Sequence, residues 1–335
     1  MVRIALDAMG GDSAPATEVE GAATALRELP PTFAVDLVGR TAMIEAELAR
    51  YPDLDRSRIG VVEAPEVVTM ADKPLDAVRK KRKSSLVVGI GLQAQGHAHA
   101  FVSAGNTGAT LAASTVLLGL HHGVARATVG TLLPTAEGPV LLLDAGANLE
   151  CSAREMVGFA HLGSIYVRDI WGRPRPAVGL LNVGEEEGKG TALIKDAHQL
   201  LKRTTGIHYV GNIEGRDILA GNQRVGRVDV VVCDGFVGNI VLKFYESVLG
   251  LVRQLATKEG LWDLPATRKA FRMLDYSQYG GAPLLGVKGN SIICHGSSNA
   301  NAILNAIRVA VQSVESDLSQ HIGVEFASHE AAGRP

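Results

Sequence analysis

The chain has 335 residues, a net charge of -2 from 33 Lys and Arg against 35 Asp and Glu, and 4% aromatic residues. It therefore lacks the basic field and the stacking platforms that a nucleic-acid partner requires. The longest apolar runs, PVLLL from Pro139 and STVLLGL from Ser114, are far shorter than the roughly 18 residues that cross a bilayer, so we expect no transmembrane span.

The N-terminus enters a strand-like run at once (VRIALDAMGG), which leaves no room for a signal peptide. We therefore expect a cytoplasmic protein. Cys151, Cys233 and Cys294 are far apart, form no C-x-x-C pair and have no zinc-like histidine spacing. No zinc site is expected.

Short apolar runs alternate with Gly/Asn/Asp loops and helical patterns along the whole chain. The runs are, in order, RIALD, AFVSA, PVLLLD, PAVGLLN, IHYVG, VDVVVCD and SIICH. Runs that are apolar on both faces and alternate with helices predict a largely parallel sheet covered on both sides. The length allows two domains, but we expect a single α/β/α domain over 1–325 and a disordered tail over 326–335.

Two helices are readable from their start signals and periodicity. Ser84 and Ser85 can cap a helix that buries Leu86, Val87 and Ile90, and a second helix is expected from 106 to 120. The section from about 246 to 279 breaks the strand-helix rhythm and predicts a helical pair. Its apolar tip, with flanking cations, suits a dimer interface or a bilayer surface through Leu261, Trp262 and Leu264.

Seven loops that follow the predicted strands share one chemistry. They are DAMGGDSAP, SAGNTGAT, DAGANLE, NVGEEEGKGT, GNIEGRD, DGFVGN and HGSSNAN. Ligands of open parallel sheets lie beyond the carboxyl ends of the strands, and glycine, neutral donors and helix N-termini suit an anion. Any one loop alone is explained by ordinary turn formation. Together, on one expected edge, they predict an amide-built anion site whose loops Asp144 and Asp234 organise by accepting backbone N-H bonds.

The loop NVGEEEGKGT resembles a nucleotide-binding P-loop only superficially. Its glycines are separated by three residues instead of four, Gly190 separates Lys189 from Thr191, and three glutamates occupy the place of phosphates. Lys189 has two open interpretations: a cation that binds an anion, or a solvated lysine paired with Glu185 to Glu187.

Six motifs carry a family resemblance: DAMGGD, VSAGNTGA, LLNVGEEEGKG, GNIEGRDI, DVVVCDGFVGN, and YGGAPLLGV with HGSS. In this order, from about residue 2 to about 325, they closely resemble the bacterial phosphate acyltransferases of phospholipid synthesis, the PlsX family. The resemblance implies a Rossmann-like α/β/α sandwich related to phosphate acetyltransferases and isocitrate/isopropylmalate-type dehydrogenases. It also implies a homodimer that uses no metal and no cofactor.

The activity implied by the resemblance is transfer of a fatty acyl group from acyl carrier protein thioester to orthophosphate. The acyl phosphate would serve a membrane glycerol 3-phosphate acyltransferase, with this protein peripheral on the inner face of the membrane. Phosphate is itself the nucleophile, and the sequence has no G-x-S-x-G elbow, so no covalent acyl-enzyme is required.

The family's motifs assign site residues in this sequence. Lys189 and Asn239 are expected to be catalytic. His295 has two interpretations, as the acid that protonates the departing thiolate or as a structural residue. Residues expected to bind phosphate or substrate are Asn106, Thr107, Gly108, Gly238, Ser297, Ser298 and His295.

The run RKKRK is the densest cluster of charge. It is either a solvated face or a surface that docks the acidic carrier protein or anionic lipid through Lys80, Lys81 and Lys83. Two rival functions stay open: another enzyme of the same architecture, such as a phosphate acetyltransferase acting on coenzyme A thioesters or a dehydrogenase, and a carrier-binding regulator without catalysis.

Overall fold

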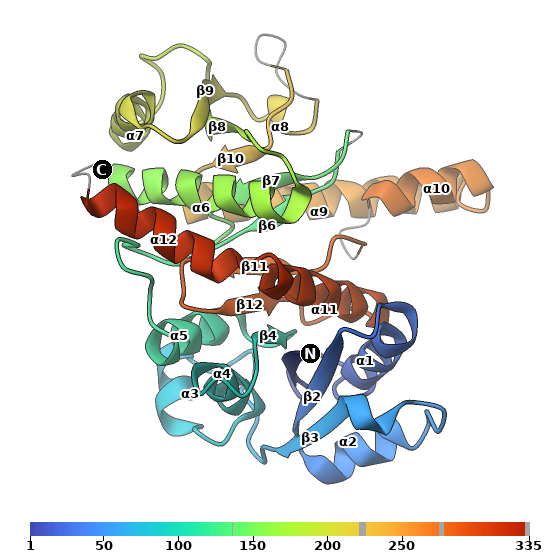
Figure 1. The fold of residues 1–335 in the computed structure, drawn as a ribbon. Helices are drawn as coiled ribbons and strands as arrows, with labels where there is room; N and C mark the ends of the chain where they lie inside the picture. Colours follow the sequence, from blue (N-terminus) through green and yellow to red (C-terminus); the bar gives the residue numbers. More distant parts are fainter. Residues whose placement is uncertain (136, 221–225, 275–277, 332–335) are drawn as a thin grey trace. The chain divides into compact units, whose positions relative to one another are not determined.

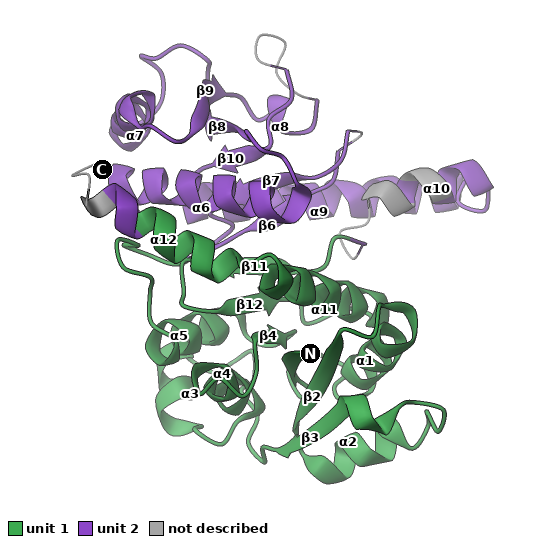
Figure 2. Cartoon of the chain, viewed as in Figure 1, with its two compact units in different colours: residues 1–127, 279–326 green, residues 128–278, 327–335 purple. Residues whose placement is uncertain are grey.

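The computed structural model describes residues 1–135, 137–220, 226–274 and 278–331 (Figure 1). The chain forms two compact units, 1–127 with 279–326 and 128–278 with 327–335 (Figure 2). The strands form two sheets, one of seven strands and one of five. The single domain predicted over 1–325 is therefore replaced by two units, which sequence rhythm did not reveal because the chain leaves the first unit and later returns to it.

The first sheet has seven strands in the order β3-β2-β1-β4-β12-β11-β5. Neighbours from β3 to β12 are parallel, with Ile4 opposite Val35 and Ala100, whereas β11 is antiparallel to β12. The strands are β1 (Val2–Asp7), β2 (Phe33–Gly39), β3 (Ile59–Glu63), β4 (Ala100–Ser103), β5 (Thr128–Val129), β11 (Ala282–Leu285) and β12 (Asn290–Ile293).

Helices cover both faces of this sheet. Along β1, Ile4 and Leu6 join a core formed with α1 and α11, whereas Ala5 joins a core formed with α3, α4 and α5. Ser84 caps α4 by accepting a bond from Val87 N, as predicted. The helices are α1 (Ala16–Glu28), α2 (Thr41–Leu48), α3 (Pro74–Lys80), α4 (Ser85–Ala94), α5 (Thr107–Leu117) and α11 (Ala300–Glu315), with a short 3₁₀ turn, η1 (Arg56–Arg58).

The second sheet has five strands in the order β6-β7-β10-β8-β9, in which only β6 runs antiparallel to its neighbour. The strands are β6 (Thr131–Leu133), β7 (Val140–Leu143), β8 (Ala177–Leu181), β9 (His208–Ile213) and β10 (Val230–Val232). The helices are α6 (Ala153–Trp171), α7 (Ala192–Arg203), α8 (Asp217–Ala220), α9 (Gly235–Lys258) and α10 (Pro265–Leu274). A capping box of Ser152 and Glu155 starts α6.

All seven strands predicted from apolar runs are confirmed, as β1, β4, β7, β8, β9, β10 and β12. The predicted helical pair is also confirmed, as α9 and α10, although α9 begins already at Gly235. The predicted disordered tail is wrong over 326–331, because α12 (Leu318–Ala331) continues through it; residues 332–335 lie outside the described part.

Helix α9 carries an exposed apolar stripe. Phe236, Ile240, Phe244, Val248 and Leu251 recur at spacings of three or four and are 38% to 69% exposed. Val237, Val241 and Tyr245 instead pack on the core of the second unit, where the Tyr245 hydroxyl donates to Pro134 O at 3.1 Å. Among the described helices, α9 alone is long and apolar enough to cross a membrane by length and composition. The expectation of no such segment considered only unbroken apolar runs.

Packing of α1 against α11 predicts the effect of a glycine substitution. A Cβ on Gly21 would lie 2.5 Å from Ile303 Cβ and 2.9 Å from Ala300 O, so Gly21→Ala should cost about 1–3 kcal/mol and lower the melting temperature by about 2–6 °C. Gly91→Ala is the matched control, because a Cβ there meets nothing within 4 Å and should stabilise α4 by up to ~1 kcal/mol. Equal melting temperatures for the two variants would contradict this packing.

Candidate functional site

The seven glycine-rich loops lie at the carboxyl edges of two sheets. Loops after β1, β4 and β12 share one edge in the first unit, because these strands are parallel neighbours. Loops after β7, β8, β9 and β10 share the corresponding edge in the second unit for the same reason. The single shared edge predicted from the sequence is therefore corrected to two edges, one in each unit.

In the first unit, Asp7 fastens the loop after β1 to the loop after β4. Its carboxylate accepts Met9 N at 3.1 Å and Ser103 Oγ at 2.7 Å, and Ser103 Oγ accepts Gly105 N at 3.0 Å. A Cβ on Gly10 would lie 2.7 Å from Gly105 N, so the two backbones approach closely. Burial raises the pKa of Asp7. These contacts fix backbone shape at the sheet edge.

Asn106 has a structural role in this geometry. Its Oδ1 caps α5 by accepting Ala109 N at 3.0 Å, and its Nδ2 donates to the carbonyls of Thr69, Met70 and Asp72 at 3.2, 3.4 and 3.2 Å. Both ends of the amide are occupied, so the contacts disfavour the predicted role of this side chain as a phosphate donor. The first N-H groups of α5, at Thr107 and Gly108, have no partner within the helix.

Within the segment 67–83, a side chain likewise donates hydrogen bonds that hold the backbone of a loop. Lys81 Nζ donates to Asp72 Oδ2 at 2.6 Å and to Val67 O at 2.9 Å, and the hydrogen bond from Lys81 lowers the pKa of Asp72 to about 2. Lys80 pairs with Asp76 at 3.2 Å, and Lys83 has an exposed side chain. Lys81 therefore braces the loop, and Lys80 and Lys83 are left as the docking candidates.

In the HGSS loop, His295 bonds within its own turn. Its Nδ1 lies 2.7 Å from Ser297 Oγ and accepts Ser297 N at 3.2 Å, while Ser298 N donates to His295 O at 2.9 Å. His295 and Ser297 are exposed. Both of these ring contacts use Nδ1, so Nε2 is the ring nitrogen that could interact with a ligand.

In the second unit, Asp144 organises the loop after β7. It is fully buried and accepts Gly146 N, Ala147 N and Asn148 N at 3.0, 2.9 and 2.8 Å. Burial raises the pKa of Asp144, although these hydrogen bonds act in the opposite direction. The predicted role of Asp144 as a loop organiser is confirmed.

The start of α9 packs directly on this loop. Asp234 caps the helix by accepting Val237 N at 2.8 Å, which confirms its predicted role. A Cβ on Gly238 would lie 1.8 Å from Asp144 O, so only glycine fits there. A Cβ on Gly146 would lie 3.3 Å from Asn239 Cβ, which places the exposed Asn239 beside the Asp144 loop.

Lys189 is exposed on a loop whose backbone is held by asparagines. Lys189 N donates to Glu186 O at 3.0 Å, and Asn212 Nδ2 donates to the same oxygen at 3.2 Å. Asn182 Nδ2 donates to Lys189 O at 3.3 Å. Sequence reasoning missed Asn182 and Asn212 because asparagine in a turn looks ordinary, although both lie inside the quoted motifs.

Glu187 does not hold Lys189. It pairs with Lys202 at 2.7 Å and lies 3.7 Å from His198 Nε2. No salt bridge between described residues includes the Lys189 ammonium. The geometry thus favours an ammonium available to a ligand over the alternative of pairing within the glutamate run.

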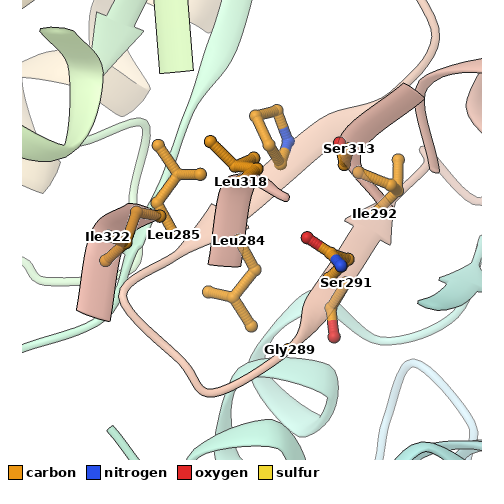
Figure 3. A pocket seen from close by; sticks show the side chains of 10 residues that line it. Leu284, Leu285, Gly289, Ser291, Ile292, Ser313, Leu318 and Ile322 are labelled. Atoms are coloured by element: carbon orange, nitrogen blue, oxygen red, sulfur yellow. The ribbon is translucent and has the colours of Figure 1, made fainter. Parts of the chain in front are cut away.

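The first unit also contains a small hollow between β11, β12, α11 and α12 (Figure 3). Half of its ten lining residues are Leu or Ile, and none of the ten is charged: the five are Leu284, Leu285, Ile292, Leu318 and Ile322. The hollow therefore offers no cation to an anionic ligand. Among the described residues no group of three or more His, Cys, Asp and Glu is arranged to hold a metal ion.

Comparison with known proteins supplies the identity. A family model described as "Fatty acid synthesis protein" matches residues 2–321. A phosphate acyltransferase of Heliobacterium modesticaldum is 48% identical over 96% of this chain and 98% of its own. Another, from Desulforamulus reducens, is 47% identical over 95% of each chain. The chain belongs to the phosphate acyltransferase family.

The fold of this phosphate acyltransferase has structural counterparts. A phosphotransacetylase from Streptococcus pyogenes superposes with a TM-score of 0.62 at 17% identity, over 93% of this chain and 94% of the other. The predicted similarity to the phosphate acetyltransferase fold is confirmed. The chain is a phosphate acyltransferase enzyme of fatty acid and phospholipid synthesis, which removes the dehydrogenase and the non-catalytic regulator from the alternatives.

The contact between Gly238 and Asp144 predicts a loss of activity in this phosphate acyltransferase. Gly238→Ala should lower turnover at least about tenfold, because the added Cβ displaces the start of α9 and with it Asn239. Gly250→Ala, in the same helix with nothing within 4 Å of the new Cβ, should retain full turnover. Steady-state assays of both variants, with circular dichroism as a folding check, make the comparison. Unchanged turnover in Gly238→Ala would show that the start of α9 does not support the reaction.

Proposed function

We propose that the enzyme transfers a fatty acyl group from the thioester of acyl carrier protein to orthophosphate, and so supplies acyl phosphate to a membrane glycerol 3-phosphate acyltransferase. Family membership supports the reaction class. The observation that carries the proposal is the exposed Lys189 ammonium, unpaired among described residues, on a loop fixed by Asn182 and Asn212.

In the proposed reaction an oxygen of orthophosphate attacks the thioester carbonyl carbon. A tetrahedral oxyanion forms, the C-S bond breaks, and the leaving thiolate takes a proton from solvent or from His295. Lys189 supplies positive charge and Asn239 a neutral donor. Orienting two bound reactants contributes roughly 7–11 kcal/mol of barrier reduction, and each oxyanion donor about 10²- to 10³-fold in rate.

Two of the three cysteines, Cys233 and Cys294, are buried, which supports direct attack by phosphate. Burial raises the pKa of Cys294 to about 12 and that of Cys233 well above its ordinary value. Buried thiols with raised pKa values carry little thiolate, which is the nucleophilic form. Neither residue is a suitable carrier of a covalent acyl intermediate.

We propose that Thr107, Gly108, Ser297 and Ser298 of the first unit contact substrate anions through N-H and hydroxyl donors. Lys80 and Lys83 are proposed to dock the acidic carrier protein. Both lie on exposed surface, and electrostatic attraction of this kind mainly accelerates association. Docking through them should weaken as salt concentration rises.

The exposed stripe of α9 supports a proposed homodimer, and the turn between α9 and α10 supports a proposed peripheral membrane contact. The exposed apolar stripe of α9 suits pairing with a second copy of the chain. In the turn between the helices, Leu261 and Leu264 are 48% and 50% exposed. Trp262 instead packs on Phe271 at 5.0 Å between ring centroids, with the Arg253 guanidinium 4.9 Å from its ring. The proposed bilayer contact therefore rests on the two leucines, with the protein otherwise in the cytoplasm.

Replacing Lys189 tests the proposed electrostatic role. Lys189→Ala should lower acyl phosphate formation about hundredfold, because it removes the positive charge opposite the developing oxyanion. Lys195→Ala, an exposed lysine of α7, is the matched control and should retain turnover. Hydroxylamine trapping of acyl phosphate gives the rates. Near-normal turnover in a folded Lys189→Ala protein would remove this assignment.

Membrane contact is tested by flotation with anionic vesicles. Leu261→Asp with Leu264→Asp should abolish flotation, because two charges replace the exposed apolar side chains of the turn. Leu219→Asp, at a residue 45% exposed in α8, should float like the unaltered protein. Undiminished flotation of the double variant would rule out the turn as the anchor.

A further inference from the structure

A buried carboxyl group lies beneath the loop that follows β1. Glu18, in the first turn of α1, is 1% exposed. Its Oε1 accepts Gly11 N at 3.2 Å, whereas its Oε2 is buried and has no hydrogen-bond partner among the described residues. A buried carboxylate with an unsatisfied oxygen is costly, so this environment favours the neutral carboxyl.

The groups that face Glu18 add to this preference. They are Asp7 at the end of β1, Asp12 in the loop, and the buried thiol of Cys294 after β12. Burial, followed by the charges of Asp7 and Asp12, raises the pKa of Glu18 to about 7. None of these neighbours can neutralise a negative Glu18.

Glu18 lies where the loop after β1 meets the loop after β12. A Cβ on Gly11 would lie 2.3 Å from Glu18 Oε1 and 3.4 Å from Gly296 O. Asp12 N donates to Gly296 O at 2.8 Å, which ties the MGGD loop to the HGSS loop. A negative charge on Glu18 would therefore lie close to the backbone at Gly296, which immediately precedes Ser297 and Ser298.

We propose that Glu18 is a positioning residue which, as a neutral carboxyl, holds Gly11 against the HGSS loop, and which weakens orthophosphate binding when it loses its proton. The inference rests on the proposed function, because it takes these loops to contact the phosphate. Ionisation sends one proton to solvent and leaves a negative charge beneath the loops. Repulsion between that charge and the phosphate anion lowers affinity without altering the reacting groups.

Glu18→Gln separates shape from charge, because the amide keeps an oxygen that accepts Gly11 N but never ionises. KM for orthophosphate is measured for both proteins from about pH 6 to about pH 8.5, and the ratio cancels the ionisation of phosphate itself. The unaltered protein's KM should rise about fivefold relative to that of the variant across this range, with an unchanged ratio of kcat values. Glu20→Gln, exposed on the same helix, should follow the unaltered protein. Parallel KM profiles for Glu18→Gln and the unaltered protein would overturn the proposal.

Thermal unfolding gives a readout that does not depend on activity. The pKa of folded Glu18, about 7, lies above its ordinary value of 4.5, so the unaltered protein loses stability relative to Glu18→Gln as pH rises between these values. The melting-temperature advantage of the variant should grow over this window and then level off. A pH-independent difference would overturn the buried-charge basis of the proposal. If the melting-temperature advantage of Glu18→Gln grows as expected but the protein does not consume orthophosphate, the proposed function is wrong and the buried charge of Glu18 is not.

Discussion

Backbone N-H groups at the carboxyl ends of parallel strands need acceptors, and in this enzyme the carboxylates of three aspartates provide them. Asp7 binds the loops after β1 and β4, Asp144 binds three successive N-H groups after β7, and Asp234 caps α9. Asp7 and Asp144 are buried, and Asp234 is half-buried. The loops can consequently keep a fixed shape while presenting neutral donors outward, which is what an anion site built from amides requires.

The loops at the strand ends contain few cations, so the position of each cation matters. Lys81 is committed to Asp72 and Val67 O, and Lys202 to Glu187. Lys189 is different, because hydrogen bonds reach its backbone while its ammonium stays unpaired among described residues. A strongly hydrated cation on a rigid loop suits a small anion that must be held and then transferred.

Much of the architecture could be predicted from sequence because local signals carry it. Runs apolar on both faces identified seven strands, and Ser84 identified the start of α4. Strand β2 was missed because Asp36 interrupts its apolar run, and that charge is paired at 2.7 Å with the distant Arg3. The division into two sheets, the use of Asn106 as a brace and the buried state of Glu18 all depend on contacts between distant segments, for which spacing gives no signal.

In the proposed reaction, bound orthophosphate is itself the nucleophile. The most direct test is a single turnover of acyl carrier thioester, with and without orthophosphate, followed by mass spectrometry of the intact enzyme. Direct attack by phosphate should give loss of thioester and appearance of acyl phosphate only when orthophosphate is present, with the enzyme mass unchanged throughout. A stoichiometric acyl adduct on the enzyme, formed without phosphate and discharged when phosphate is added, would contradict it.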